Sequence, residues 1–432
     1  MKHLIGSMLA TTGFATLAVA TPAGADVVAM NQPAESVTAE RIAKLPPAQR
    51  RIWTAYLTRS QAQMRADKAS LAAERRPGMP VPPAPPGGNG VLTMPLDRDA
   101  AWYRSDAARH VADVVLSFQT PAGGWSKNQP RNGARRLPGQ PYVGDNSNGQ
   151  STPGDFDASA SWHYVGTIDN DATTHEIRFL ARMARNASGA DAARYRTGVD
   201  RGVRYLLNAQ YPHGGWPQVW PLEGKYHDAI TLNDNAMTQV LDLMADVGTG
   251  AGDFASVAPA LRKRATAAAA RGLDCILRLQ VVVNGRRTGW GQQHDALTLR
   301  ITSARNYEPA ALAAPESAAL LRYLMGLPRR TPAITTAIDS GVAWLRATAI
   351  HGQAWRDAND GKGRSLHADP NAPLLWARFY TVDGNRPIFG DRDKTLHDDV
   401  MELSGGRRRG YAWYGTAPNA ALERYAAWQR GG

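Results

Sequence analysis

The sequence predicts an all-α protein: an α/α toroid, which is a partly open barrel of helical hairpins, with long functional loops and a few short strands. The main observation is a loop that runs from Gln to Gly-Trp and recurs at 119–125, at 210–216 and, with an insertion, at 280–290. Each copy follows a stretch whose apolar residues have the spacing of a helix face. The copies lie too far apart for a simple solenoid. We therefore expect hairpins of unequal loop length around one axis, with chance recurrence of a common helix end as the alternative.

Helices alternate with long loops from residue 102 onward. The expected helices are 105–119, 172–187, 192–209, 235–247, 259–280, 310–325, 332–349 and 417–430. Short strands are expected at 281–283 and 376–380, which are rich in β-branched or aromatic residues. Loops of this length inside a compact domain usually carry function. We therefore expect the functional site in the loops.

The second Gly-Trp loop combines a helix end with three aromatic rings. Gly214 and Gly215 end the preceding helix, because glycine reaches backbone conformations that other residues avoid. Trp216, Trp220 and Tyr226 follow before the next helix begins. Such a loop fits a sugar-binding surface, and it fits a plug of the hydrophobic core as well.

Composition divides the chain into three parts. Residues 1–25 have the basic start, the apolar stretch and the Ala-x-Ala site of a secretory signal peptide. Residues 26–95 are expected to form a charged helical arm that ends in a Pro/Gly-rich linker, and 96–432 the catalytic domain. We expect a secreted or periplasmic monomer. The single Cys275 lies in an apolar helical run, so it is expected to be buried and inert.

The chain is strongly basic, with a formal net charge of +12 at pH 7. A strongly basic exported protein attracts polyanions. Export, together with arginines that are scattered rather than clustered, favours an acidic polysaccharide over nucleic acid. No stretch after the signal peptide is apolar enough to span a membrane. A basic surface with no role in binding remains the alternative.

Two polar clusters stand just before expected helices, at 167–174 and 230–235. Each offers carboxylate and amide oxygens, the hard ligands that Ca²⁺ prefers. Asp and Asn at these positions are also ordinary helix N-caps, and the helix dipole disfavours a cation there. A calcium site and simple capping therefore both stay open.

Two further segments, 303–309 and 374–389, place arginines among aromatic residues. A guanidinium group binds a planar carboxylate at two points, while a ring can stack on a sugar. The alternative is an arginine paired with a structural Asp or Glu. The sequence contains no phosphate-binding loop, no Gly-x-Ser-x-Gly, no His-Glu-x-x-His and no paired Cys motif.

These segments together resemble polysaccharide lyase family 10, the pectate lyases. The motifs are GGWSKN at 123–128, TIDNDATT at 167–174, GGWPQ with ITLNDNAM at 214–237, SARNYEP at 303–309 and LLWARFY with NRPIFGDRD at 374–393. The resemblance covers about residues 98–430 and leaves the amino-terminal arm outside. It implies a partly open α/α toroid that cleaves polygalacturonate, or pectin, with Ca²⁺.

The resemblance also implies roles for individual residues. Arg305 is the expected Brønsted base. Asp169, Asn170 and Asp234 are expected to form the centre that binds calcium and the substrate carboxylate, and Asp171 is the alternative to Asp169 as metal ligand. The expected substrate-binding residues are Asn170, Arg378, Arg386, Lys127 and Tyr307.

The implied reaction is a β-elimination that gives 4,5-unsaturated oligogalacturonides. Calcium on the substrate carboxylate would make the neighbouring C5 proton easier to remove. Arginine has a reference pKa of about 12.5–13.8, so we expect desolvation and neighbouring cations, such as Ca²⁺ and Arg378, to lower its pKa and the activity to be highest at alkaline pH. The alternatives are an inverting glycoside hydrolase that uses Asp169 and Asp234, and a non-catalytic pectin-binding protein. A terpene cyclase, which shares the helical shape, disagrees with export and with the arginine-rich loops.

Overall fold

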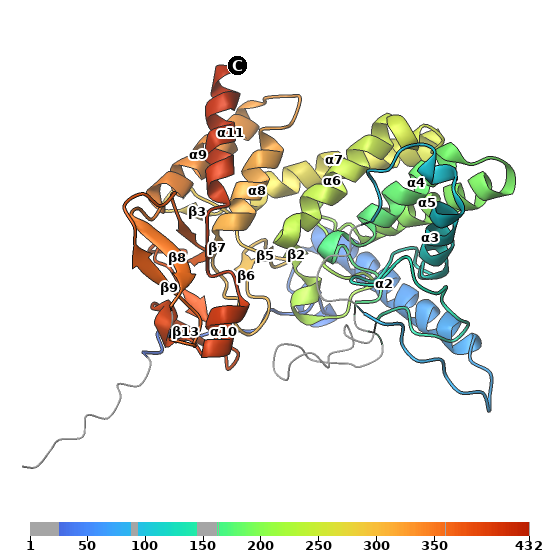
Figure 1. Ribbon diagram of the computed structural model, residues 1–432, viewed down its shortest axis with the longest axis horizontal. Helices are drawn as coiled ribbons and strands as arrows, with labels where there is room; N and C mark the ends of the chain where they lie inside the picture. The colour runs from blue at the N-terminus through green and yellow to red at the C-terminus, as the bar shows by residue number, and fades with distance from the viewer. Residues whose placement is uncertain (1–25, 88–93, 145–161, 163, 359, 432) are drawn as a thin grey trace, which may run out of the picture.

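The computed structural model describes residues 26–87, 94–144, 162, 164–358 and 360–431 (Figure 1). Its α-helices are α1 (Ala39–Ala43), α2 (Pro47–Ala73), α3 (Asp106–Ser117), α4 (Thr174–Asn186), α5 (Gly189–Ala209), α6 (Ala236–Thr249), α7 (Pro259–Leu279), α8 (Ala314–Leu324), α9 (Pro332–Ala347), α10 (Gly405–Gly410) and α11 (Pro418–Arg430). All eight helices expected between residues 102 and 432 are present, within a few residues at each end. The expected signal peptide and the end of the linker lie outside the described residues.

The helices pack in pairs that follow one another along the chain. Helices α3, α5, α7 and α9 contact each other in succession, while α4 packs on α5, α6 on α7 and α8 on α9. Figure 1 shows these pairs as an arc from α3 to α9, with α11 against α8 and α9. The largely helical class is therefore confirmed. Closure of the pairs into a toroid stays a prediction.

The strands are short and more numerous than the sequence indicates. They are β1 (Ala29–Met30), β2 (Ile230–Thr231), β3 (Val282–Val283), β4 (Arg286–Arg287), β5 (Gln293–His294), β6 (Ile301–Thr302), β7 (Leu312–Ala313), β8 (Gln353–Asp357), β9 (Arg364–Ala368), β10 (Trp376–Ala377), β11 (Phe379–Tyr380), β12 (Phe389–Gly390), β13 (Thr395–His397) and β14 (Tyr414–Gly415). The expected strands appear as β3, β10 and β11. Most of the others have two residues, too few to show an alternating pattern.

The small antiparallel sheet β2–β5–β6 determines where the functional loops meet. In it Ile230 pairs with His294, and His294 pairs with Ile301. The sheet brings the segments that follow β2 and β6 to the same side of the molecule, beneath the helices in Figure 1.

The Gly-Trp loops are structural repeats that connect one helix to the next. In each copy the Gln side-chain amide donates to a carbonyl of its own loop and to a carbonyl of the next helix in the row, and the Trp indole N–H donates to the helix before the loop. The Gln acceptors are Gly123 and Gly198 for Gln119, Gly214 and Ala268 for Gln210, and Thr288 and Ala337 for Gln280. The indole acceptors are Val115 for Trp125, Leu206 for Trp216 and Ile276 for Trp290.

This pattern decides between the two interpretations of the aromatic loop. The Trp216 and Trp220 side chains are buried in the core, so they plug the core and present no surface to a sugar. Only Tyr226, the third ring, lines a pocket. Gly214 has a φ of 98°, and a Cβ there would lie 2.1 Å from the Arg271 carbonyl oxygen, so no other residue fits the close approach of this loop to α7.

Residues 26–73 pack against the helical row. The Trp53 and Tyr56 rings, on α2, are buried against Tyr211, at centroid distances of 5.1 and 5.0 Å. Strand β1 pairs with β13, near the other end of the chain. The division into an arm and a catalytic domain at residue 95 stays a prediction. Within the described residues, no helix has the combination of length and apolar character needed to span a membrane.

Candidate active site

Two short 3₁₀ turns carry the acidic clusters, η3 (Asp169–Asp171) before α4 and η5 (Asn233–Asn235) before α6. The backbone in both turns enters the left-handed region, with φ of 50° at Asn170 and 49° at Asp234. Asn and Asp tolerate this conformation better than most residues. The helix behind η3 has its own cap, because Glu176 accepts the backbone N–H of Thr173 at 2.7 Å. The Asp169 carboxylate is therefore not needed for capping.

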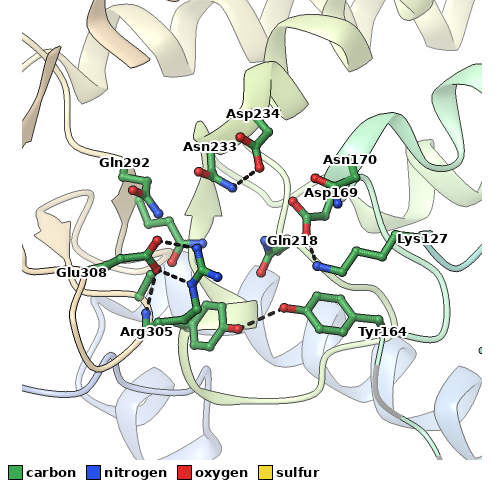
Figure 2. Close-up of a pocket in the computed structure, with 13 residues that line it drawn as sticks. Lys127, Tyr164, Asp169, Asn170, Gln218, Asn233, Asp234, Gln292, Arg305 and Glu308 are labelled. Atoms are coloured by element: carbon green, nitrogen blue, oxygen red, sulfur yellow. Dashed lines mark hydrogen bonds and ion pairs between the residues drawn. The ribbon is translucent and has the colours of Figure 1, made fainter. Parts of the chain in front are cut away.

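One pocket collects residues from both turns and from the segment after β6 (Figure 2). Its lining residues are Lys127, Tyr164, Asp169, Asn170, Gln218, Tyr226, Asn233, Asp234, Gln292, Gln293, Ala304, Arg305 and Glu308. Five residues predicted from the sequence thus lie together: Lys127, Asp169, Asn170, Asp234 and Arg305. Figure 2 shows Arg305 and Glu308 on one side of the pocket, and Lys127 with Asp169 on the other.

Asp169 is almost completely buried at the wall of the pocket. Its Oδ2 forms an ion pair with the Lys127 ammonium group, which lies 3.8 Å from the centroid of the Tyr164 ring. Its Oδ1 is buried and has no hydrogen-bond partner among the described residues. A buried carboxylate oxygen without a partner is costly, so this atom is suited to accept a cation or a donor from a ligand.

Asp234 stands opposite Asp169 on η5. Its Oδ2 accepts a hydrogen bond of 2.6 Å from the Asn233 amide. The side chain is exposed toward the pocket, whose walls displace part of its water. This desolvation, together with repulsion from Asp169 and Glu316, raises the pKa of Asp234 to about 6, although Arg378 and Lys127 act in the opposite direction. Negative charge is therefore crowded between the two turns.

Asn170 and Asp171 are held on different sides of η3. The Asn170 amide nitrogen donates to Asn128 Oδ1 at 2.9 Å, beside the pocket. The Asp171 side chain points into a neighbouring cavity, where it accepts a hydrogen bond from Gln239 and lies 3.9 Å from His175. Asp169 therefore occupies the position of a ligand better than Asp171 does.

Arg305 is held at two points by Glu308. Its Nε and Nη2 donate to the two Glu308 carboxylate oxygens at 2.9 and 2.7 Å, and its backbone N–H donates to the same carboxylate at 3.0 Å. Tyr411 donates to Glu308 as well, at 2.6 Å. Among the described residues none engages Arg305 Nη1, and the side chain is 31% exposed, whereas Glu308 is 2% exposed.

The ion pair determines the acid–base state of Arg305. Burial lowers the pKa of Arg305, but the Glu308 charge and hydrogen bonds outweigh this effect and hold the pKa well above its usual range. The same pair holds the pKa of Glu308 well below its usual range. The expectation that the surroundings lower the arginine pKa is therefore wrong for the protein alone. It considered desolvation and the nearby cations, and it missed the opposing charge of Glu308.

Arg378 lies in the adjoining cavity, which shares Asp234 with the pocket. Its Nη2 donates to Glu316 at 2.7 Å. Its Nε is buried and has no hydrogen-bond partner within the part of the chain that the structure describes. Burial lowers the pKa of Arg378 and Glu316 raises it, with a net rise, so the group stays a cation. It is placed to bind an anion beside Asp234.

Two further predicted substrate-binding residues, besides Arg378, do not line the pocket. Tyr307 is buried, with its ring edge-on to Tyr411 at 5.1 Å and beneath Arg407 at 3.9 Å, so it presents no face to a sugar. Arg386 is exposed on the turn between β11 and β12, and its backbone N–H donates to Thr381 at 3.2 Å. Their substrate-binding roles stay predictions without support from this geometry.

Several pocket residues were not among the predicted site residues, although Gln218, Asn233 and Glu308 belong to the motifs that carry the resemblance. They include Tyr164, Gln218, Asn233, Gln292, Gln293 and Glu308. For Glu308 the sequence offered a further signal, because an acidic residue three positions after an arginine in a tight turn can fold back onto it. The Tyr164 hydroxyl lies 3.0 Å from that of Tyr226, in the second Gly-Trp segment.

The oxygen donors of the pocket can be compared with those that a calcium ion requires. Within the described residues there is no group of three or more His, Cys, Asp or Glu side chains arranged to hold a metal. Asp169 and Asp234 supply two carboxylates, with one oxygen unpartnered, and Ca²⁺ takes six to eight oxygen ligands that can include water and amide oxygens. The residues therefore fit a cation that is shared with a bound carboxylate.

A pocket built in the loops of a helical fold, with cations beside paired carboxylates, agrees with an enzyme of the polysaccharide lyase class. A scan against protein families matches the family described as pectic acid lyase over residues 119–422. The chain belongs to this family, and it is a pectate lyase. The sequence-based assignment to polysaccharide lyase family 10 is confirmed.

Two solved structures support this assignment. A mutant of a family 10 polysaccharide lyase from Cellvibrio cellulosa, in complex with trigalacturonic acid, is 31% identical, with a TM-score of 0.63 and coverage of 78% of this chain and 99% of that chain. The family 10 polysaccharide lyase from the same organism is 32% identical, with a TM-score of 0.62 and coverage of 78% and 98%. The comparison with curated proteins gave no match.

Proposed function

We propose that this pectate lyase cleaves α-1,4-polygalacturonate by calcium-assisted β-elimination, with Arg305 as the Brønsted base. The observation that carries the proposal is the orientation of Arg305: Glu308 holds one edge of the guanidinium group, and among the described residues no hydrogen-bond partner holds Nη1, in a pocket that also contains Asp169 and Asp234. The complex of a similar enzyme with trigalacturonic acid supports a galacturonate substrate.

The charges of the pocket suit a chain of uronic acids. Arg378, with its unpartnered Nε, binds one substrate carboxylate. Lys127 contributes a second positive charge next to Asp169. Asp169 and Asp234, with the amide oxygen of Asn170, would hold Ca²⁺ between the protein and the substrate carboxylate. Calcium there would neutralise that carboxylate and so stabilise the negative charge that develops next to C5.

The elimination then needs one proton acceptor on the chain. Arg305 takes the C5 proton through Nη1, the C5–H electron pair becomes the C4=C5 double bond, and the C4–O4 bond breaks with its electrons on O4. The departing oxygen takes a proton from water. Only the neutral form of Arg305 can accept the proton, and Glu308 disfavours that form. Glu308 therefore fixes the orientation of the base and lowers the fraction of it that is active at neutral pH.

The alternatives from the sequence are less well supported. An inverting hydrolase needs one carboxyl group as acid and the other as free base, and Asp234, with its pKa of about 6, could serve as the acid. Asp169 is poorly suited as the base, because Lys127 already pairs with it. Membership of a lyase family supports elimination over hydrolysis and over binding alone.

The remaining expectations belong to the same proposal. We propose that the protein is exported to the periplasm or the medium, acts as a monomer on an anionic polysaccharide and not on nucleic acid or membranes, and carries its loops on a partly open toroid. The formal net charge of +12 supports an anionic substrate.

The test compares two products of the same digestion. Purified protein is incubated with polygalacturonate, and the ultraviolet absorbance of unsaturated uronide is followed beside the number of new reducing ends. Elimination raises both signals in a one-to-one ratio. Reducing ends without absorbance would show hydrolysis, and neither signal, with retained binding to the polymer, would show a binding protein.

A further inference from the structure

The turn that carries Arg305 is tied to the amino-terminal end of the described chain. Residues 26–44, called here the N-terminal strap, run along the back of the pocket loops. Within the strap, the Asn31 side-chain amide lies 3.2, 2.9 and 3.2 Å from the carbonyl oxygens of Arg305, Asn306 and Glu308. Asn31 is 7% exposed, so water does not replace it readily.

These three carbonyls belong to one tight turn. The Glu308 N–H donates to the Arg305 carbonyl at 2.8 Å, and the Ala304 N–H donates to the Glu308 carbonyl at 3.1 Å. The turn points three carbonyl oxygens toward Asn31, and a further donor placed between them offsets their mutual repulsion and ties the turn in place. Asn31 supplies that donor from a segment more than 270 positions away in the chain.

The strap contacts the turn from one side, and strand β12 approaches it from the other. The strap is itself fixed to β13. Strand β1 pairs with β13, and the Asn31 N–H donates to the Lys394 carbonyl at 2.8 Å. On the β12 side a Cβ on Gly390 would lie 2.5 Å from the Tyr307 carbonyl oxygen, which shows how closely the two backbones approach. The turn is therefore clamped between residues that lie far apart in the sequence.

The same strap holds other loops of the pocket. The Val37 N–H donates to Asp228 at 2.9 Å, two residues after the pocket residue Tyr226. Arg41 forms an ion pair of 2.6 Å with Asp295, which follows Gln292 and Gln293. The Ser303 hydroxyl donates to the Gln32 carbonyl, at the beginning of the Arg305 turn.

We propose that Asn31 is a positioning residue for the catalytic base, and that the strap is part of the active-site architecture although it lies outside the residues that match the family. The family match begins at residue 119. Asn31 does not line the pocket; it acts through the Arg305 turn by fixing the direction of Nη1. The catalytic part of this inference depends on the proposed function, whereas the effect on the turn does not.

The test uses two Asn31 variants and two matched controls. Asn31→Ala removes the donor, and Asn31→Asp keeps the shape but places a carboxylate against three carbonyl oxygens. Gln32→Ala is the local control, because that exposed side chain donates only to the Met30 carbonyl, at 3.3 Å. Thr331→Ala is the stability control, because Thr331 caps α9 by accepting the Ile334 N–H at 3.3 Å, far from the pocket.

Two readouts distinguish positioning from general stability. The first is amide hydrogen exchange of the 303–309 segment, which needs no activity: it should speed up in both Asn31 variants and in neither control. The second is turnover of polygalacturonate: kcat should fall by roughly 10- to 100-fold in both Asn31 variants, as for a base displaced by about 1 Å. KM should change by less than about threefold, because the substrate carboxylates bind elsewhere.

Three other outcomes would overturn the proposal. Unchanged exchange in 303–309 would show that Asn31 does not hold the turn. An equal loss of kcat in Thr331→Ala would show that the Asn31 variants act only through lost stability. Full activity of Asn31→Asp would show that the shape of the Asn31 side chain matters and its hydrogen-bond donation does not. The remaining outcome is faster exchange in the Asn31 variants together with a wild-type protein that has no lyase activity. It would support the contact between Asn31 and the turn and contradict the proposed function instead.

Discussion

The Arg305 guanidinium group and the Glu308 carboxylate form a two-point ion pair, with distances of 2.9 and 2.7 Å from Nε and Nη2. The pair fixes the plane of the guanidinium group and leaves Nη1 as the nitrogen that a substrate can reach. It also stabilises the protonated form of Arg305, which cannot accept a proton. The enzyme thus combines a well-oriented base with a low population of its active form.

The first prediction concerns pH. Because the pKa of Arg305 is raised, the neutral fraction increases about tenfold per pH unit throughout the range below that pKa. The value of kcat/KM should therefore rise steadily from neutral to alkaline pH, until binding or stability becomes limiting. The measurement is kcat/KM at constant calcium and ionic strength. A maximum near neutral pH would contradict an arginine base held by Glu308.

The second prediction separates the two effects of Glu308. Glu308→Gln removes the negative charge that raises the pKa of Arg305, so the rising limb of the pH profile should move to lower pH. The highest rate should still fall, because an amide can accept only one of the two guanidinium hydrogens that the carboxylate accepts. Glu423→Gln, on the exposed face of α11, is the control. A lower rate with an unshifted limb would show that Glu308 only orients the base.

The third prediction concerns calcium. A chelator should abolish cleavage of polygalacturonate and added Ca²⁺ should restore it, since Lys127 pairs only with Oδ2 of Asp169 and leaves Oδ1 without a partner among the described residues. Asp169→Ala should raise the calcium concentration for half-maximal activity by at least about tenfold. Asp171→Asn should have a smaller effect, because Asp171 points into the neighbouring cavity. A second readout is the thermal stability of the protein with trigalacturonate, which should rise when Ca²⁺ is added. Full activity in excess chelator would exclude the calcium centre.

The fourth prediction separates binding from chemistry. Arg378→Ala should weaken the binding of trigalacturonate by roughly 1.5–3 kcal/mol, the range for a hydrogen bond to a charged group, while kcat at saturation changes less. The variant should also be less stable, because Glu316 is 4% exposed and loses its partner. Arg356→Ala, an exposed arginine on β8, is the charge control. A loss of kcat with unchanged binding would move Arg378 from substrate binding to the reaction itself.

The helices could be predicted because each buries one face and therefore shows a periodic pattern, as in 259–280, which corresponds to α7. The strands could not, because a two-residue strand is too short to show a pattern and can depend on a distant partner, as β5 depends on β2. The Gly-Trp repeat indicated the helical row correctly. It could not show that the Trp216 ring faces the core, since a buried ring and a sugar-binding ring give the same pattern.

The pocket could be predicted in part. Asp169, Asp234 and Arg305 belong to motifs, so the resemblance placed them before the structure did. Gln292 and Gln293 lie in a segment without a distinctive pattern and reach the pocket through the β2–β5–β6 arrangement. The pairing of Arg305 with Glu308 reversed the expected direction of the arginine pKa, because a charge three residues away acts only when the turn is formed.

The fifth prediction concerns the repeat itself. Gly214→Ala should destabilise the protein by about 3–5 kcal/mol or prevent its accumulation, because a Cβ would lie 2.1 Å from the Arg271 carbonyl oxygen. Gly285→Ala is the matched control: its φ is also positive, at 76°, but a Cβ there meets nothing within 4 Å. Chemical denaturation measures both variants. Equal losses would show that backbone conformation alone, and not the close approach to α7, requires Gly214.

The most direct test of the account is the turnover of Arg305→Lys. Lysine keeps the positive charge but cannot reproduce the two-point contact with Glu308 or the position of Nη1. The rate at which unsaturated uronide forms should fall by roughly 10²–10⁴-fold, while trigalacturonate binding stays within a few-fold of the wild type. Turnover near the wild-type rate, or a loss of affinity alone, would show that Arg305 is not the base.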